Sequence, residues 1–130
     1  LFFNRFSMLI TLFIPLINNY INYLLPLINN YMSYIRYIKQ TRANTDTAFF
    51  SPSAEVVAKI DEYRAAGKIE SYNLETISEN QLNKEMKITF DNVNSFDEFM
   101  DEDIILDSAA ARTSYCTNNT ISYSLEDELI

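Results

Sequence analysis

IESYNLETISENQLNKEMKITF, residues 69–90, carries the strongest structural signal in the chain. Apolar and polar side chains alternate with a period of two, loosely over residues 69–78 and more clearly over residues 82–90. The three residues between these runs, 79–81, are polar. Two alternating runs around a short polar turn predict a β-hairpin that buries one of its faces.

A helix is expected immediately before this hairpin. Ser51 can cap its free amides, and Pro52 suits its first turn because the missing N–H costs nothing there. Apolar residues then recur at helical spacing from Val56 to Tyr63. Gly67 is the only glycine in the chain, and a glycine directly after such a stripe is typical of the left-handed residue that ends a helix.

A second helical region is expected after the hairpin. Ser95 and Glu98 stand three residues apart, which is the spacing of a capping box, where the two residues satisfy each other's backbone donors. A further helix of small residues is predicted from residue 107 or 108 to about residue 115. Strands are predicted over residues 32–41 and 120–124.

The order of these elements is strand, helix, strand, strand, broken helix, strand. This order predicts an α+β domain with a ferredoxin-like split βαβ arrangement, in which an antiparallel sheet carries helices on one face. An apolar amino-terminal segment, helical or unstructured, precedes it. We expect residues 32–125 to form this single domain and residues 126–130 to form an acidic tail.

Residues 1–31 differ in character because they contain most of an 11-residue tandem repeat. Residues 14–24 and 25–35 match at seven of eleven positions, in residue types that AT-rich codons encode. This pattern favours a short DNA repeat that is read in frame, with the native protein starting at Met32. The alternative is a membrane anchor in residues 1–35, since a span needs roughly 20 apolar residues, although prolines and asparagines interrupt this stretch.

Charge is divided unevenly along the chain. Residues 1–42 carry a net charge of +4, whereas residues 43–130 contain 6 basic and 18 acidic residues, a net charge of −12. Because an acidic body repels phosphate backbones, we expect no nucleic-acid binding by charge neutralisation. A membrane is expected as a partner only if residues 1–31 are translated.

The residue types present argue against many kinds of catalytic and cofactor site. The chain has no histidine, one glycine and one cysteine, so it lacks the commonest general base, a phosphate-binding glycine loop and a cysteine-held metal cluster. We therefore expect no catalytic residues, no cofactor and no enzymatic activity. Asp101, Asp103 and Asp107 are weak candidates for a divalent-cation site, but acids near a helix start are better explained as a solvated face.

The two faces of the predicted sheet have different expected roles. Between sheet and helices, a small ligand pocket would be lined by Tyr72, Met86, Phe90 and Phe99. The opposite face has no helix to cover it, and Ile69, Ile77 and Thr89 are expected there. Exposed apolar area of that kind often marks an interface, so we expect a homodimer through this face, with another protein as the alternative partner.

Several short motifs resemble those of small uncharacterised proteins from large tailed phages of marine bacteria. They are Phe49-Phe50-Ser51-Pro52, Tyr63-Arg64-Ala65-Ala66-Gly67-Lys68-Ile69, Leu82-x-Lys84, Ile88-Thr89-Phe90, Phe96–Phe99 and Arg112-x-x-Tyr115. The resemblance covers roughly residues 32–125. It implies a non-enzymatic phage accessory or virion-associated interaction protein, located in the host cytoplasm or the virion.

The order of elements also looks like dimeric ferredoxin-like monooxygenase-type domains. Some of those domains use histidines, which this chain lacks. This second likeness favours an alternative function, a dimer that binds a small ligand between sheet and helices. An acidic decoy that mimics DNA is a third alternative.

Overall fold

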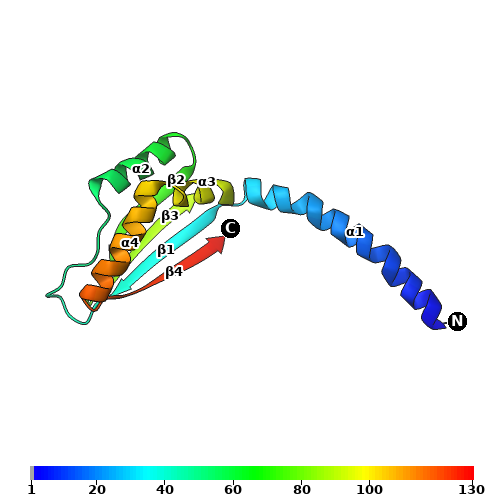
Figure 1. Cartoon of the computed structure of the whole chain (residues 1–130), viewed down its shortest axis with the longest axis horizontal. Helices are drawn as coiled ribbons and strands as arrows, with labels where there is room; N and C mark the ends of the chain where they lie inside the picture. The colour runs from blue at the N-terminus through cyan, green and yellow to red at the C-terminus, as the bar shows by residue number, and fades with distance from the viewer. Residues whose placement is uncertain (1) are drawn as a thin grey trace.

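The computed structural model describes residues 2–130, in which one long helix precedes a four-stranded sheet and three further helices (Figure 1). The elements are α1 (Phe2–Tyr31), β1 (Tyr34–Thr41), α2 (Ala54–Ala65), β2 (Ile69–Ile77), β3 (Asn83–Phe90), α3 (Val93–Met100), α4 (Asp103–Asn118) and β4 (Ser122–Leu129). The strands are antiparallel, in the order β2-β3-β1-β4. The predicted ferredoxin-like α+β class is confirmed.

The core lies between the sheet and the helices that cover it. Alternate side chains of a strand point to the same face, so Tyr34 and Ile38 of β1 share the helix-facing side with their partners Phe90 and Met86 of β3. The Tyr34 ring stacks on Phe96 of α3, with 4.2 Å between centroids. The buried cluster at the centre comprises Val56, Ile60, Tyr63, Ile69, Ile88, Phe90, Phe96, Phe99 and Ile105.

The outer face of the sheet carries fewer apolar residues than the alternation predicted. Ile69 lies in the core, with 1% of its surface exposed, and Ile77 pairs with the helix-facing Lys84. The prediction that these two isoleucines lie on the outer face was wrong, because the register of β2 shifts twice against β3 and each shift changes which side chains face outward. Thr89 does lie on the outer face, opposite Ile35.

Helix α2 begins two residues later than expected. Its cap is Ser53, whose side-chain oxygen accepts a hydrogen bond from the Val56 amide at 3.3 Å. The prediction of Ser51 as the cap was wrong, because Ser51 lies in the preceding loop and its hydroxyl accepts a hydrogen bond from the Lys84 ammonium at 2.9 Å. Ser51 therefore connects the loop to the sheet rather than starting the helix.

The end of α2 is the one that the sequence predicted. Gly67 has a φ of +77°, in the left-handed region. The Gly67 amide donates to the Arg64 carbonyl at 3.0 Å, and the Lys68 amide donates to the Tyr63 carbonyl at 2.9 Å. These two bonds form a Schellman motif, so Gly67 satisfies the last carbonyls of the helix and directs the chain into β2.

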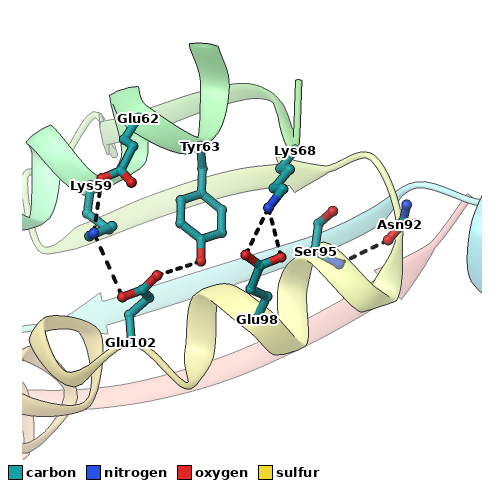
Figure 2. Close-up of polar contacts among 8 residues, drawn as sticks. All are labelled: Lys59, Glu62, Tyr63, Lys68, Asn92, Ser95, Glu98 and Glu102. Atoms are coloured by element: carbon teal, nitrogen blue, oxygen red, sulfur yellow. Dashed lines mark hydrogen bonds and ion pairs between the residues drawn. The ribbon is translucent and has the colours of Figure 1, made fainter. Parts of the chain in front are cut away.

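Helix α3 is capped by Asn92, and the predicted capping box of Ser95 and Glu98 was wrong. The Asn92 side chain accepts a hydrogen bond from the Ser95 amide at 2.9 Å (Figure 2). Because the helix starts at Val93, Ser95 is already in its first turn and cannot be the residue outside it. Glu98 is free for another partner, and it accepts hydrogen bonds from the Lys68 ammonium at 2.8 and 3.0 Å.

The carboxyl-terminal elements are longer than expected. Helix α4 begins at Asp103, and strand β4 continues to Leu129, so residues 126–129 belong to the sheet and not to an acidic tail. The acidic side chains of this segment are paired with residues of β1. Asp127 binds Arg36 at 2.8 Å, Glu126 binds Lys39 at 2.7 Å and Glu128 accepts from the Tyr37 hydroxyl at 3.2 Å.

Helix α1 extends away from the sheet and its covering helices (Figure 1). It is a continuous 30-residue helix although it contains Pro15 and Pro26. Asn94 of α3 donates a hydrogen bond to Asn30 near the end of α1 at 3.2 Å. Among the described residues, no helix is both long and apolar enough to cross a membrane.

Candidate functional site: an apolar cavity between sheet and helices

A cavity of about 60 Å³ lies between the helix-facing side of the sheet and helices α2, α3 and α4. Its apolar lining consists of Ile38, Met86, Ile88 and Phe90 from the strands, Val56 and Ile60 from α2, Phe96, Phe99 and Met100 from α3, and Ile105 and Ala109 from α4, with Phe50 and Pro52 from the loop before α2. A water molecule occupies about 30 Å³ of liquid. The cavity therefore has the volume of about two waters.

A surface hollow of about 320 Å³ lies beside this cavity. It runs between the start of α2 and the first half of α4, and it shares Phe50, Val56 and Ser108 with the cavity lining. Ligand sites in proteins typically measure about 300–1,000 Å³. The hollow is in that range, and Phe50 stands at its boundary with the cavity.

The backbone of Phe50 is held by two buried polar side chains of the sheet. The Gln40 amide nitrogen donates to the Phe50 carbonyl at 2.9 Å, and the Phe50 amide donates to the Gln40 carbonyl oxygen at 2.9 Å. The Lys84 ammonium donates to the same Phe50 carbonyl at 3.1 Å. Burial lowers the pKa of Lys84. Gln40 and Lys84 break the apolar pattern of their strands because they fix this loop at the edge of the cavity.

Arg36 of β1 forms one polar part of the cavity wall and is fully paired. Its guanidinium makes two parallel hydrogen bonds to Asp127 of β4, both at 2.8 Å, and lies over the Phe96 ring at 4.6 Å from the centroid. The hydrogen bonds from Arg36 lower the pKa of Asp127. Burial, and then the hydrogen bond to Asp127 at 2.6 Å, raise the pKa of Tyr34 to about 12.

Arg112 of α4 is the second guanidinium in the cavity wall, and it has a different environment. Its Nε is buried and has no hydrogen-bond partner within the part of the chain that the structure describes. Its Cζ lies 5.2 Å from the centroid of the Tyr123 ring. Burial lowers the pKa of Arg112, and this effect outweighs the opposing influence of Tyr123 and Cys116. The cavity thus combines apolar walls with a guanidinium that has unused hydrogen-bonding capacity.

A set of polar contacts fixes α2 to the α3–α4 segment (Figure 2). The Tyr63 hydroxyl donates to Glu102 at 2.8 Å, and Lys59 lies 3.8 Å from the same carboxylate and 2.9 Å from Glu62. Burial, followed by the hydrogen bond to Glu102, raises the pKa of Tyr63 above its ordinary value. These contacts hold two walls of the cavity at a fixed separation.

Three of the four residues predicted to line a pocket do line this cavity: Met86, Phe90 and Phe99. Tyr72 does not, because its hydroxyl donates to Asp61 of α2 at 2.6 Å and its side chain packs at the edge of the core. The two arginines were missed as wall residues. The sequence offered one signal for a special role of Arg112, which is the only basic residue after Lys87.

The weak metal candidates are not brought together as a site. Within residues 2–130, no group of three or more potential ligands lies in an arrangement that could hold a metal ion. Asp101 follows the last residue of α3, Asp103 is the first residue of α4, and Asp107 lies one turn further along the helix. All three are exposed.

A larger open hollow, of about 610 Å³, lies where β1 ends and β3 and β4 begin. Some of the side chains around it are held by contacts within the chain. Thr41 donates to Asn83 at 2.8 Å, and Lys39 is bound to Glu126. Because this hollow is more open to solvent and has a more polar lining, it is a weaker candidate for an apolar ligand site than the cavity beside Arg112.

Comparison with known proteins yields similarity in fold. No family model matches the chain, and no curated protein matches its sequence. Among solved structures, a conserved protein of unknown function from Bacteroides thetaiotaomicron, described as a possible oxidoreductase, has a TM-score of 0.48 at 9% identity and covers 78% of this chain and 99% of its own. A hydroxynitrile lyase from Passiflora edulis has a TM-score of 0.47 at 12% identity, and the match covers 75% of this chain and 93% of the lyase. SnoaB, a cofactor-independent oxygenase from Streptomyces nogalater, has a TM-score of 0.46 at 12% identity, and the match covers 76% of this chain and 91% of SnoaB.

These matches correct two predictions. The solved structures are described as an oxygenase, a lyase and a possible oxidoreductase, so the prediction of a non-enzymatic phage accessory protein was wrong, as was the prediction that the chain is not an enzyme. The comparisons give no support to the resemblance to phage proteins. At 9–12% identity the likeness concerns the fold alone.

Proposed function

We propose that this protein binds a small apolar molecule in the space that the cavity between sheet and helices forms together with the hollow beside Phe50, since the cavity alone has room for about two waters. The observation that carries this proposal is that the two spaces adjoin, since they share Phe50, Val56 and Ser108 as lining residues. Rotation of the Phe50 ring would join the apolar cavity to a hollow of ligand size. A bound molecule replaces water against apolar walls, at a gain of about 25 cal/mol per Å² of apolar surface buried.

The lining residues suit such a ligand. Met86 and Met100 have flexible, polarizable side chains that adapt to different shapes, and Phe96 and Phe99 present aromatic faces. The polar contacts between α2 and Glu102 keep the opposite wall in place while the side chains near Phe50 adjust. The site is therefore rigid on one side and adaptable on the other.

A cavity-filling substitution tests the proposal. Ala109 of α4 lines the cavity, whereas Ala110 is exposed on the same helix. We expect neutral aromatic probes, toluene and indole, to bind the native chain in ligand-observed saturation-transfer NMR. A109L should weaken this binding at least tenfold because the leucine occupies the cavity, and A110L should leave it unchanged.

Two results would contradict the proposal. One is a native chain that binds neither probe, and the other is equal binding by A109L and A110L. Following the bound probes by NMR over hours also shows whether the chain converts them, since a reaction would produce new ligand resonances.

We also propose that the chain forms a homodimer through the outer face of its sheet. Basic and acidic side chains alternate across this face, with Lys39 and Lys87 beside Glu85 and Glu126. A two-fold axis through such a face brings opposite charges of the two copies together. The support for this interface is charge complementarity and not apolar area, since Ile69 lies in the core.

Light scattering coupled to gel filtration at low micromolar concentration tests the dimer. We expect the mass of two chains at 50 mM salt and a shift toward one chain at 500 mM, because salt screens surface charges. K87E should also shift the mass toward one chain. A single-chain mass at both salt concentrations, or a dimer that K87E does not alter, would argue against this interface.

A further inference from the structure

We infer that the cavity selects a ligand with an anionic oxygen, a small carboxylate with an apolar body, which Arg112 binds. This inference rests on the proposed binding function and specifies the class of ligand. It begins with the charges of the cavity wall. Two guanidinium groups line the cavity, and only that of Arg36 has a carboxylate partner, because it binds Asp127 in bidentate fashion. One positive charge in the wall therefore lacks a carboxylate partner among the described residues.

The Arg112 guanidinium has a buried donor that could bind an acceptor. The Nε of Arg112 is buried without a hydrogen-bond partner in the described part of the chain. A buried donor without a partner costs about 1–3 kcal/mol, and native proteins keep few of them. An anionic acceptor at Arg112 would both satisfy this donor and balance the guanidinium charge, whereas a neutral acceptor would only satisfy the donor.

The shape of the group favours a carboxylate. The donors of a guanidinium lie in one plane, in a fork that matches the two oxygens of a carboxylate. The walls beyond Arg112 are apolar, with Phe96, Phe99 and Ile105 contributing to the same cavity. A molecule that fits both features has a carboxylate at one end, at Arg112, and an aromatic or short aliphatic body that extends from the cavity into the hollow beside Phe50.

An isosteric pair of probes tests the inference. Benzoate and benzamide have the same ring and nearly the same shape, but only benzoate carries a charge. We expect the native chain to bind benzoate at least tenfold more tightly than benzamide. R112Q should retain benzamide binding and lose the preference, whereas R64Q, which makes the same charge change at an exposed position of α2, should keep the preference.

A direct spectroscopic measurement does not depend on the folding of R112Q. Addition of benzoate to the native chain should shift one arginine Nε–H resonance in a ¹⁵N correlation spectrum, assigned to Arg112 by its absence in R112K. A109L should lose both the shift and the binding, because its leucine fills the cavity.

The outcomes separate the two proposals. If benzoate and benzamide bind with equal affinity, or if R112Q keeps the preference, the inference about Arg112 is overturned while the binding function stands. If benzoate binds A109L as well as it binds the native chain, it binds elsewhere on the surface, and the inference is again overturned. If neither compound binds, the proposed function and this inference fall together.

Discussion

Gly67 determines where α2 ends and how the chain turns into β2. Its φ of +77° lies in the region that side chains with a Cβ rarely adopt. A Cβ built on Gly67 meets no atom within 4 Å. The requirement for glycine at this position therefore comes from the backbone and not from lack of space.

Substitution of Gly67 tests this explanation. G67A should lower the free energy of unfolding by about 1–2 kcal/mol, the cost of placing an L-residue in the left-handed region. G67N should cost less, because asparagine tolerates this conformation. Thermal or urea unfolding of the two variants measures the difference, and equal losses in both would contradict the backbone explanation.

At the scale of elements, the features that could be predicted from the sequence are those that a local residue pattern determines. The hairpin and the end of α2 follow from alternation and from a single glycine, and both are local signals. The starts of α2 and α3 could not be fixed in the same way, because Ser51 and Ser53 both precede the helical stripe and Asn92 competes with Ser95 for the role of cap. Which residue caps depends on where tertiary packing places the first helical turn.

The candidate site could be predicted only in part for a related reason. Met86, Phe90 and Phe99 are apolar residues on the expected faces of their elements, so their convergence follows from the fold. Arg36 and Arg112 come from β1 and α4, which are distant in the sequence, and nothing local indicates that they share one wall. The extent of β4 was missed because its acidic residues resemble a tail until their partners in β1 are known.

The pairing of β4 with β1 gives a pH-dependent prediction. Arg36 lowers the pKa of Asp127 below its ordinary value of 3.8. This group therefore stabilises the fold at pH values above about 4, and its contribution is lost as the pH falls through the lowered folded-state pKa. D127N should reduce the free energy of unfolding at pH 7 by about 1–2 kcal/mol.

A pH series provides the control for this prediction. The stability difference between the native chain and D127N should shrink as the pH is lowered below 4, because the native carboxyl also becomes neutral. E126Q alters an exposed pair with Lys39 on the same strand and should leave the unfolding midpoint unchanged. A D127N deficit that is constant down to pH 2 would contradict the assigned ion pair.

At the scale of the whole molecule, the fold divides into a projecting helix and a packed α+β body (Figure 1). The sheet, α2, α3 and α4 enclose the buried core and the candidate site. Helix α1 contributes no residue to the core cluster or to the cavity lining among the described residues. Most of its described large apolar side chains are exposed: Phe13, Ile14, Leu16, Ile17, Tyr20, Ile21, Tyr23, Leu25, Leu27 and Tyr31.

Removal of residues 1–31 tests whether residues 32–130 form an independent domain. We expect the truncated chain to unfold cooperatively, with a free energy of unfolding within about 1 kcal/mol of the full chain, since the Asn30–Asn94 hydrogen bond is an exposed contact. Far-UV circular dichroism and urea unfolding measure both quantities. A truncated chain without a cooperative transition would show that α1 is required for the fold.

The hydrogen bonds that Gln40 and Lys84 form with the Phe50 backbone bear on the rate at which a ligand could enter the cavity. Because three hydrogen bonds fix the Phe50 backbone to the sheet, the freedom that remains at this boundary is rotation of the ring about its side-chain bonds. Side-chain rotations of exposed residues are far faster than the microsecond-to-second opening of lids and loops, and Phe50 is half-buried. On the proposed entry route, a rotamer of Phe50 therefore governs passage between hollow and cavity, and the time a molecule spends inside is set by its contacts with the walls rather than by the opening of a loop.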